Sequence, residues 1–302
     1  MSCLIKNARL PLIMDNIPSD VTPFHFQSLD FYVKRDELID PYLSGNKYRK
    51  LYTLLQTPPE TYNTVTSYGG TQSNAMLSIA ALCEQKSWQF EYYCKPVSST
   101  LKTQPQGNLK AALDLGMILL ETTNYENTTR KLQSQDKTLV IPQGGAAPLA
   151  EQGIKVLADE IKQWQQEQNI NKLNVITPSG TGTTAYYLAK HLPDCQVLTT
   201  ASVGDNIYLT QQMRQLGNMP HNLKLLEPSR KYHFAKPYPE FLETYQALKQ
   251  SGIAFDLIYA PLMWQALLTS MQNIQGTVLY VHSGGLMGNT TMLERYAHKG
   301  LL

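Results

Sequence analysis

Short β-rich runs alternate with helical patterns along most of this chain, and that alternation limits the fold more than any other feature. Residues 63–68 predict a strand, and residues 73–85 have the small and apolar side chains of a buried helix. Strands separated by helices pair most readily in parallel, with helices on both faces of the sheet. The pattern therefore predicts an α/β protein with mainly parallel sheets. The alternation continues through strands at 90–94, 117–121, 138–141, 173–177, 196–201 and 277–282 and helices at 107–115, 149–166, 183–192 and 209–216.

Two sheets accommodate these segments better than one. The chain has 302 residues, which is enough for one large domain or two of medium size. Residues 51–141 carry their own series of strands and helices, which ends at the turn PQGGAAP. We therefore expect two three-layer domains: a small α/β domain at 51–141, inserted into a large domain formed by 1–50 and 142–302.

Three glycine-rich turns follow predicted strands and could together hold an anionic cofactor. They are YGGTQSNAM at 68–76, TPSGTGTTA at 177–185 and VHSGGLMGN at 281–289. Glycine permits tight turns, and a helix that starts after such a turn exposes unpaired backbone N–H groups that attract anions. The second turn could surround a phosphate with N–H and O–H donors. These donors would come from Gly180, Thr181, Gly182, Thr183 and Thr184.

Polar residues in the first and third turns allow two interpretations each. Ser73 and Asn74 could simply cap the helix that follows them. In the functional interpretation, Asn74 contacts the ring of the cofactor and its phenolic oxygen, and Ser73 contacts the carboxylate or the reacting carbon of a substrate. Ser283 could belong to nothing more than a tight turn, or its hydroxyl could face a ring nitrogen of the cofactor.

The second turn also matches a dinucleotide-binding fingerprint, GxGxxA, through Gly180, Gly182 and Ala185. That fingerprint needs an acidic residue at the end of the next strand, about 20 residues further on, to hold a ribose. The next predicted strand ends at Ala201, and Asp205 lies beyond it, which disfavours a dinucleotide. No GKS or GKT follows the glycines, so a P-loop is excluded. There is also no HExxH, no GxSxG and no cluster of metal ligands, and we expect no metal.

The composition of the chain limits the kinds of partner that it could bind and the compartment in which it works. A net charge of +2 and the absence of a basic run argue against nucleic acid; RKYHFAKPY at 230–238 is better interpreted as a surface loop than as a weak nucleic-acid patch. No apolar run approaches the roughly 20 residues that span a bilayer, and the first residues lack the apolar core of a signal peptide. The four cysteines are scattered, which is typical of reduced thiols in the cytoplasm.

Lys47 lies in SGNKYRKL, directly after the extended-looking FYVKRDEL at 31–38. A lysine at the start of a helix is usually a solvated surface charge. Beside three turns that could hold an anionic cofactor, it instead suggests a Schiff base with pyridoxal phosphate (PLP).

Taken in order, these motifs resemble the 1-aminocyclopropane-1-carboxylate (ACC) deaminase and D-cysteine desulfhydrase family. KRDEL…SGNKYRKL is similar to KRDDL…GGNKxRKL, YGGTQSN to GGxQSN, and GNLKAALDLGM to GNLLLDRLLGA. IPQGGAAPLAEQG, DLIYAP and VHSGG are similar to IPxGGSxPLGxxG, DPVYxG and HxGG. The resemblance covers most of the chain. It implies the tryptophan synthase β-like fold (PLP fold type II), PLP as cofactor, a small amino acid as substrate, and a homodimer.

The resemblance also implies roles for single residues. Lys47 would bind PLP, residues 180–184 would bind its phosphate, and Tyr259 would contact the substrate and handle protons. ACC deaminases carry a glutamate that faces the pyridine nitrogen where this chain has Ala260, and a leucine where it has Ser283. Desulfhydrase-like members carry small hydroxyl residues at both positions. Ala260 cannot bond a ring nitrogen but Ser283 can, so the pair favours desulfhydrase-like chemistry over opening of a cyclopropane.

The resulting expectation is a PLP-dependent α,β-elimination on a small amino acid, preferably a D-amino acid, that yields a 2-oxo acid and ammonia. Three alternatives stay open: ACC deaminase proper, a racemase or β-replacement enzyme, and a PLP-binding protein without catalysis. The last is suggested by Pro261-Leu262, which replace a Gly-Lys pair of the family.

Overall fold

The computed structural model describes residues 18–302, except residues 134, 146 and 147. The N-terminal residues in which we expect no signal peptide lie outside the described residues, as do Cys3 and two alanines of PQGGAAP. The other three cysteines are buried free thiols. Within the described ranges, no helix is long and apolar enough to cross a membrane.

Six strands form the larger sheet, in the order β1-β2-β10-β7-β8-β9. Only β1 and β2 are antiparallel to each other; the other neighbours pair in parallel. Side chains of both faces are buried, because alternate residues of β10 enter different cores: Leu279 and Val281 on one face, Val278 and Tyr280 on the other. The strands are β1 (Val21–Phe26), β2 (Leu29–Lys34), β7 (Leu173–Ile176), β8 (Gln196–Thr199), β9 (Leu223–Leu225) and β10 (Thr277–Val281).

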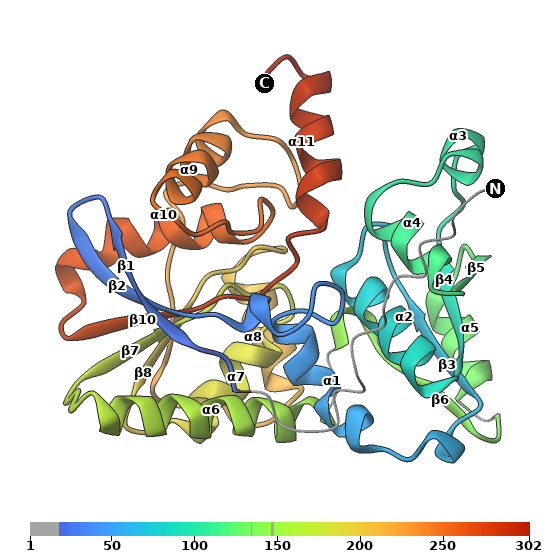
Figure 1. The fold of residues 1–302 in the computed structure, drawn as a ribbon, viewed down its shortest axis with the longest axis horizontal. Coiled ribbons are helices and arrows are strands. Elements are labelled where there is room, and N and C mark those ends of the chain that lie inside the picture. The colour runs from blue at the N-terminus through green and yellow to red at the C-terminus, as the bar shows by residue number, and fades with distance from the viewer. Residues whose placement is uncertain (1–17, 134, 146–147) are drawn as a thin grey trace, which may run out of the picture.

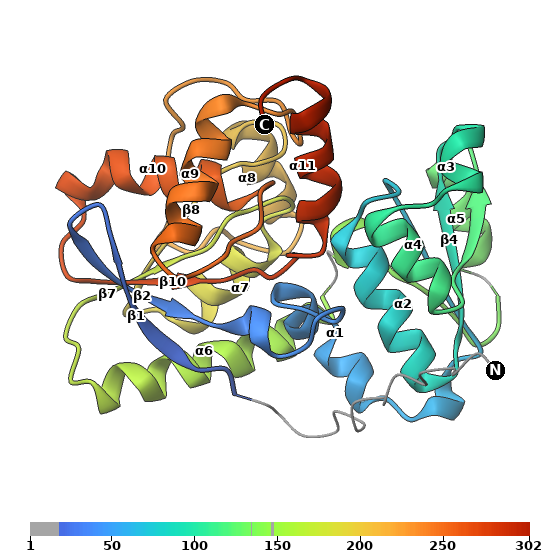
Figure 2. The same cartoon turned by 45° about the horizontal axis from the view of Figure 1, so that its top comes forward.

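Helices cover both faces of this sheet. Figures 1 and 2 show α6 and α7 on one side of it and α9 and α10 on the other. Helix α1 carries Lys47 and packs along α6 at the side that faces the smaller sheet. The helices are α1 (Asn46–Gln56), α6 (Ala150–Glu167), α7 (Thr183–His191), α8 (Asn206–Arg214), α9 (Pro239–Gln250), α10 (Ala260–Ser270) and α11 (Gly288–His298).

The smaller sheet has four parallel strands in the order β5-β4-β3-β6 and a core of its own. Its strands are β3 (Thr64–Tyr68), β4 (Gln89–Cys94), β5 (Ile118–Glu121) and β6 (Thr138–Val140), and its helices are α2 (Asn74–Lys86), α3 (Ser99–Thr103), α4 (Gly107–Asp114) and α5 (Tyr125–Leu132). The prediction of mainly parallel sheets covered by helices is thus confirmed. The domain boundaries stay a prediction; the first of them falls inside α1.

Three local expectations were wrong. Residues 31–38 are not extended throughout, because β2 ends at Lys34 and Asp36–Leu38 form a 3-10 turn. Strand β8 ends at Thr199 rather than at 201. Helix α8 begins at Asn206, three residues before the predicted start, because the Asp205 carboxylate accepts the N–H of Tyr208 at 2.8 Å and caps the helix.

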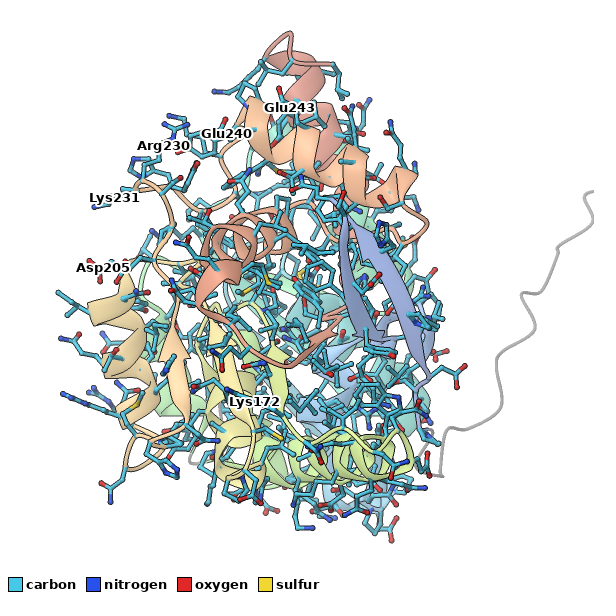
Figure 3. The ribbon with its side chains drawn as sticks, turned by 90° about the vertical axis from the view of Figure 1, so that its left-hand side faces the viewer. Lys172, Asp205, Arg230, Lys231, Glu240 and Glu243 are labelled. Atoms are coloured by element: carbon cyan, nitrogen blue, oxygen red, sulfur yellow. The ribbon has the colours of Figure 1, made fainter. Side chains whose placement is uncertain are left out.

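The basic and aromatic segment at 230–238 forms a loop on the flank of the larger unit. Figure 3 shows Arg230 and Glu240 close together there. Arg230 forms an ion pair with Glu240 and lies over the rings of Tyr232 and Tyr238. Its charge is therefore paired with Glu240 at the start of α9 and with the two rings of the loop.

Candidate active site

A cavity between the two sheets brings the predicted turns together with α1. Every residue to which the sequence assigned a catalytic or cofactor-binding role lines it, except Ser73. Ser73 is the N-cap of α2, and its hydroxyl accepts the N–H of Met76 at 3.3 Å. The lining consists of Asn46, Lys47, Lys50, Asn74, Gly144, Pro178, Ser179, Gly180, Thr181, Gly182, Thr183, Thr184, Tyr259 and Ser283.

Gly45 allows α1 to start directly against the turn after β10. Its φ is +57°, and a Cβ at this position would lie 2.2 Å from the backbone of Ser283, so only glycine fits. The next N–H, that of Asn46, donates to the Ser283 carbonyl at 3.2 Å. This close approach is what places Lys47 beside Ser283.

Buried charges fix the side of α1 that faces away from the cavity. The Arg49 guanidinium donates to both oxygens of Asp36, at 2.8 and 3.0 Å, and to both oxygens of Glu160, at 2.6 and 2.8 Å. Lys34 also pairs with Glu160, at 2.6 Å. Burial opposes ionisation of Asp36, but the charge and hydrogen bonds of Arg49 outweigh it and hold the pKa of this carboxyl below its usual value. These contacts tie α1 to β2 and α6.

Lys47 and Lys50 point from one face of α1 into the cavity. Burial lowers the pKa of Lys47 to about 8, although the charge of Asp256 opposes the shift. Its Nζ donates to Asn46 Oδ1 at 2.9 Å, and part of the side chain stays open to the cavity. An amine with this pKa is partly neutral near pH 7, as a nucleophile or base must be.

Lys50 is a cavity residue that the sequence interpretation missed. It is 4% exposed, and its Nζ donates to the Gly144 carbonyl at 3.1 Å. Burial first, and the charge of Lys47 second, lower the pKa of Lys50 well below its usual value. The signal was available: lysines three residues apart in NKYRK must share one face of a helix.

The turn after β7 has the form of an anion cradle. Gly182 caps α7 with a φ of +77°, and a Cβ there would lie 2.5 Å from Met213. The hydroxyls of Thr181 and Thr183 are 3.0 Å apart. The Thr184 hydroxyl is buried and has no partner among the residues that the structure describes. A buried orphan hydroxyl beside free helix N–H groups fits an anion that completes the set.

Tyr259 lies against the cradle, beside Gly180. Its ring lies 3.5 Å from where a Cβ on Gly180 would be. Asp256 holds its backbone, accepting the N–H groups of Ile258 at 3.0 Å and Tyr259 at 2.6 Å. Burial and then the charge of Asp256 raise the pKa of Tyr259 above its usual value, so the phenol stays protonated. Pro261 sits in the first turn of α10, where a missing N–H costs no helical hydrogen bond.

Ser283 lines the cavity, whereas its neighbour His282 does not. Nδ1 of His282 accepts the N–H of Gly284 at 3.1 Å, and Nε2 lies 2.9 Å from the Ala254 carbonyl. These partners give Nε2 a hydrogen-bond acceptor and Nδ1 a donor. Ala260 is buried in the core beneath α10 and is not among the lining residues.

Comparisons with known proteins test the resemblance to the family. No family model matches the chain. It is 27% identical over 288 residues to a candidate ACC deaminase of Thermotoga maritima, covering 86% of this chain and 89% of that protein. It is 24% identical over 313 residues to a D-cysteine desulfhydrase of Salmonella paratyphi A, covering 93% and 95%. The resemblance to the ACC deaminase and D-cysteine desulfhydrase family is confirmed.

Solved structures confirm the fold that this family resemblance implied. A structure described as an ACC deaminase homologue superposes with a TM-score of 0.78 at 20% identity, over 99% of this chain and 98% of that one. The fold is the tryptophan synthase β-like fold of PLP fold type II.

The cavity suits the cofactor of this family. Lys47 could supply a partly neutral amine for the aldehyde carbon of PLP. Lys50, the N–H groups at the start of α7 and the unpartnered Thr184 hydroxyl could hold a phosphate. Ser283 and Asn74 border the space between these two groups, where a ring would lie.

Proposed function

We propose that this chain is a PLP-dependent enzyme that removes ammonia from a small amino acid by α,β-elimination and leaves a 2-oxo acid. The observation that carries the proposal is the pair of lysines, the half-buried Lys47 and the buried Lys50, on the face of α1 that opens to the anion cradle at 180–184. When bound, PLP supplies an electron sink for negative charge on the α-carbon of the substrate.

Lys47 has two tasks in this proposal. It would hold the cofactor through its amine, and the same amine, when free, would take the proton from the α-carbon of the substrate. A pKa of about 8 leaves a useful fraction of the amine unprotonated at neutral pH. Because deprotonation produces the active form, the rate should rise with pH up to about that value.

Lys50 and the cradle have a binding task. The ammonium of Lys50 would pair with the phosphate, whose negative charge favours the protonated lysine and offsets the cost of burial. Thr184 would donate its orphan hydroxyl to the same group. Both contacts anchor the cofactor at the end away from the chemistry.

Ser283, Tyr259 and Ser73 would select the reaction. A serine hydroxyl facing the pyridine nitrogen, with no acid at Ala260, leaves that nitrogen largely unprotonated, which favours rapid loss of a β-substituent. Tyr259, held protonated, can donate to the leaving group. Ser73, whose oxygen accepts from Met76 and whose hydroxyl also hydrogen-bonds with Tyr92, would have to turn its hydroxyl hydrogen to a substrate carboxylate.

D-Cysteine is the substrate that these features favour, and with water it would give sulfide, ammonia and pyruvate. The choice lies between the reactions for which the two relatives are named: one is a desulfhydrase and the other a candidate ACC deaminase. The homodimer and the cytoplasmic location expected from the sequence stay predictions.

The test is a product assay on the PLP-loaded protein with D-cysteine, L-cysteine, D-serine and ACC. We expect sulfide and pyruvate from D-cysteine, abolished in Lys47→Ala and unchanged in Lys162→Ala, an exposed lysine. Turnover of ACC alone would contradict the argument from Ala260 and Ser283. Racemised or substituted products would favour a racemase or β-replacement enzyme, and bound PLP without any turnover would favour a non-catalytic protein.

A further inference from the structure

Asn108, the second residue of α4, is fully buried, and its backbone and side-chain N–H groups donate to the segment that carries Asn74. Its backbone N–H donates to Gln72 Oε1 at 3.1 Å. Its side-chain Nδ2 donates to the Gln72 carbonyl at 3.0 Å and to Asn74 Oδ1 at 2.8 Å. Asn108 lies outside the cavity lining, so it contacts the site only through these neighbours.

The orientation of the Asn108 amide is determined by its partners. The Gln72 carbonyl can only accept, so the side-chain atom that faces it must be the nitrogen. Both N–H groups of that nitrogen are then used, and Oδ1 of Asn108 has no partner among the described residues. The side chain therefore leaves one acceptor unpaired in order to point both donors at Gln72 and Asn74.

This arrangement determines the orientation of Asn74 in turn. Its oxygen must face the donor from Asn108, so its own nitrogen turns the other way, with two N–H groups still to place. A Cβ on Gly285 would lie 2.3 Å from that nitrogen. The absence of a side chain at Gly285 therefore leaves room for it. Asn74 lines the cavity together with Lys47 and Ser283.

We propose that Asn108 is a positioning residue that fixes the Asn74 amide so that the cavity receives N–H donors and no carbonyl oxygen. The ligand group that such donors recognise is an acceptor oxygen on the cofactor ring, the phenolate of PLP. This inference rests on the proposed function, because it concerns how the same cofactor is held.

A double-mutant cycle on PLP binding tests the proposal. The dissociation constant of PLP and the absorbance spectrum of the bound cofactor are measured for the wild-type protein, Asn74→Ala, Asn108→Ala and the double variant. Each single change should weaken binding about tenfold, the usual scale for one hydrogen bond to a charged oxygen. The double variant should bind no more weakly than Asn74→Ala, and Asn108→Ala should shift the spectrum in the same direction as Asn74→Ala.

Asn222 provides a matched control. It is another buried asparagine, and its Nδ2 donates to the carbonyls of Ala189, Leu192 and Cys195, at 3.1, 2.8 and 2.8 Å. Asn222→Ala should lower the melting temperature of the apoprotein without changing the PLP dissociation constant or the spectrum.

Three outcomes would overturn the inference. Unchanged PLP affinity and spectrum in Asn108→Ala would remove it while the proposed function stands. Losses that multiply in the double variant would show that Asn108 acts independently of Asn74, as a merely structural residue does. Failure of the wild-type protein to bind PLP would remove the inference and the proposed function together.

Discussion

In the cavity, burial shifts the pKa values of single residues more than specific partners do. Burial lowers the pKa of Lys47 and raises that of Tyr259, so each moves toward its neutral form. The sequence could identify both residues as candidates, from their motifs. It could not predict their ionisation, because that depends on protein atoms contributed by distant segments.

The pH dependence of PLP capture follows from this. A group with a depressed pKa gains its reactive, neutral form as pH rises through the folded value, which is about 8 for Lys47, whereas an ordinary lysine needs a pH of about 10.4. The rate of PLP capture by the apoprotein, followed by absorbance in a stopped-flow instrument, should have its midpoint near pH 8. A midpoint above pH 10 would show that Lys47 is solvated.

A substitution of Asp256 tests the pKa of Lys47 a second time. Its negative charge raises the pKa of Lys47, and an asparagine would keep an acceptor oxygen for the N–H groups of Ile258 and Tyr259. Asp256→Asn should therefore move the midpoint of capture to lower pH. An unchanged midpoint would mean that the carboxyl is neutral, and a shift to higher pH would contradict the assigned effect of its charge.

Ser283 is the residue on which the choice of reaction depends most. Ser283→Ala removes the hydroxyl and leaves the backbone carbonyl that binds α1. We expect the rate of elimination from D-cysteine to fall about tenfold, the effect of one hydrogen bond to the ring, with an altered spectrum of bound PLP. Unchanged kinetics and an unchanged spectrum would count against a contact with the ring nitrogen.

At the scale of elements, α1 is the part whose placement matters most. It is held on one side by the close approach of Gly45 to Ser283 and on the other by Arg49 between Asp36 and Glu160. Arg49→Leu would leave the buried Asp36 carboxylate without its cation and Glu160 paired with Lys34 alone. Because an uncompensated buried charge is costly, we expect a loss of about 3–5 kcal/mol in the free energy of unfolding.

Urea unfolding measures this loss, with Lys155→Ala as the control. Lys155 pairs with Asp159 at 2.7 Å on the exposed face of α6, and removing such a pair costs about 0.5 kcal/mol or less. Equal small losses in both variants would mean that the charges around Arg49 are hydrated.

Elements in which apolar residues recur with a clear period, or which a glycine-rich turn bounds, could be predicted from the sequence. Strand β3 and helices α2, α6 and α7 lie within a residue or two of their expected positions. The β1–β2 hairpin was missed because its two-residue turn uses Gln27 and Ser28 at positive φ, without the glycine or asparagine that marks such turns. Strand β9 has only three residues, too few for a detectable alternation.

At the scale of the whole molecule, the site depends on the topology that places the two sheets side by side. Parallel strands deliver their following turns to one edge of each sheet, which is why three motifs far apart in sequence could be predicted to meet. Lys50, Asn108 and the partners of Arg49 could not be predicted this way, because their roles depend on side chains that only the tertiary fold brings together. Ser73 shows the converse, since a promising motif residue caps a helix and does not line the cavity, and its contact with a substrate stays a prediction.

Bound PLP should stabilise the whole chain, because its contacts come from both sheets. At a concentration 100 times the dissociation constant, binding adds about 2.7 kcal/mol, or roughly 5 °C in melting temperature for a chain of this size. Differential scanning fluorimetry with and without PLP measures the shift, which should be smaller in Lys50→Ala. No shift in the wild-type protein would mean that the cavity does not hold the cofactor.

The most direct test of the account asks which residue PLP modifies. The purified protein is incubated with PLP, reduced with borohydride to make the bond to the amine permanent, digested and analysed by mass spectrometry. The account predicts one phosphopyridoxyl group, on Lys47, and none at that site in Lys47→Ala. Modification spread over surface lysines, or located on another buried lysine such as Lys50 while Lys47 stays free, would contradict it.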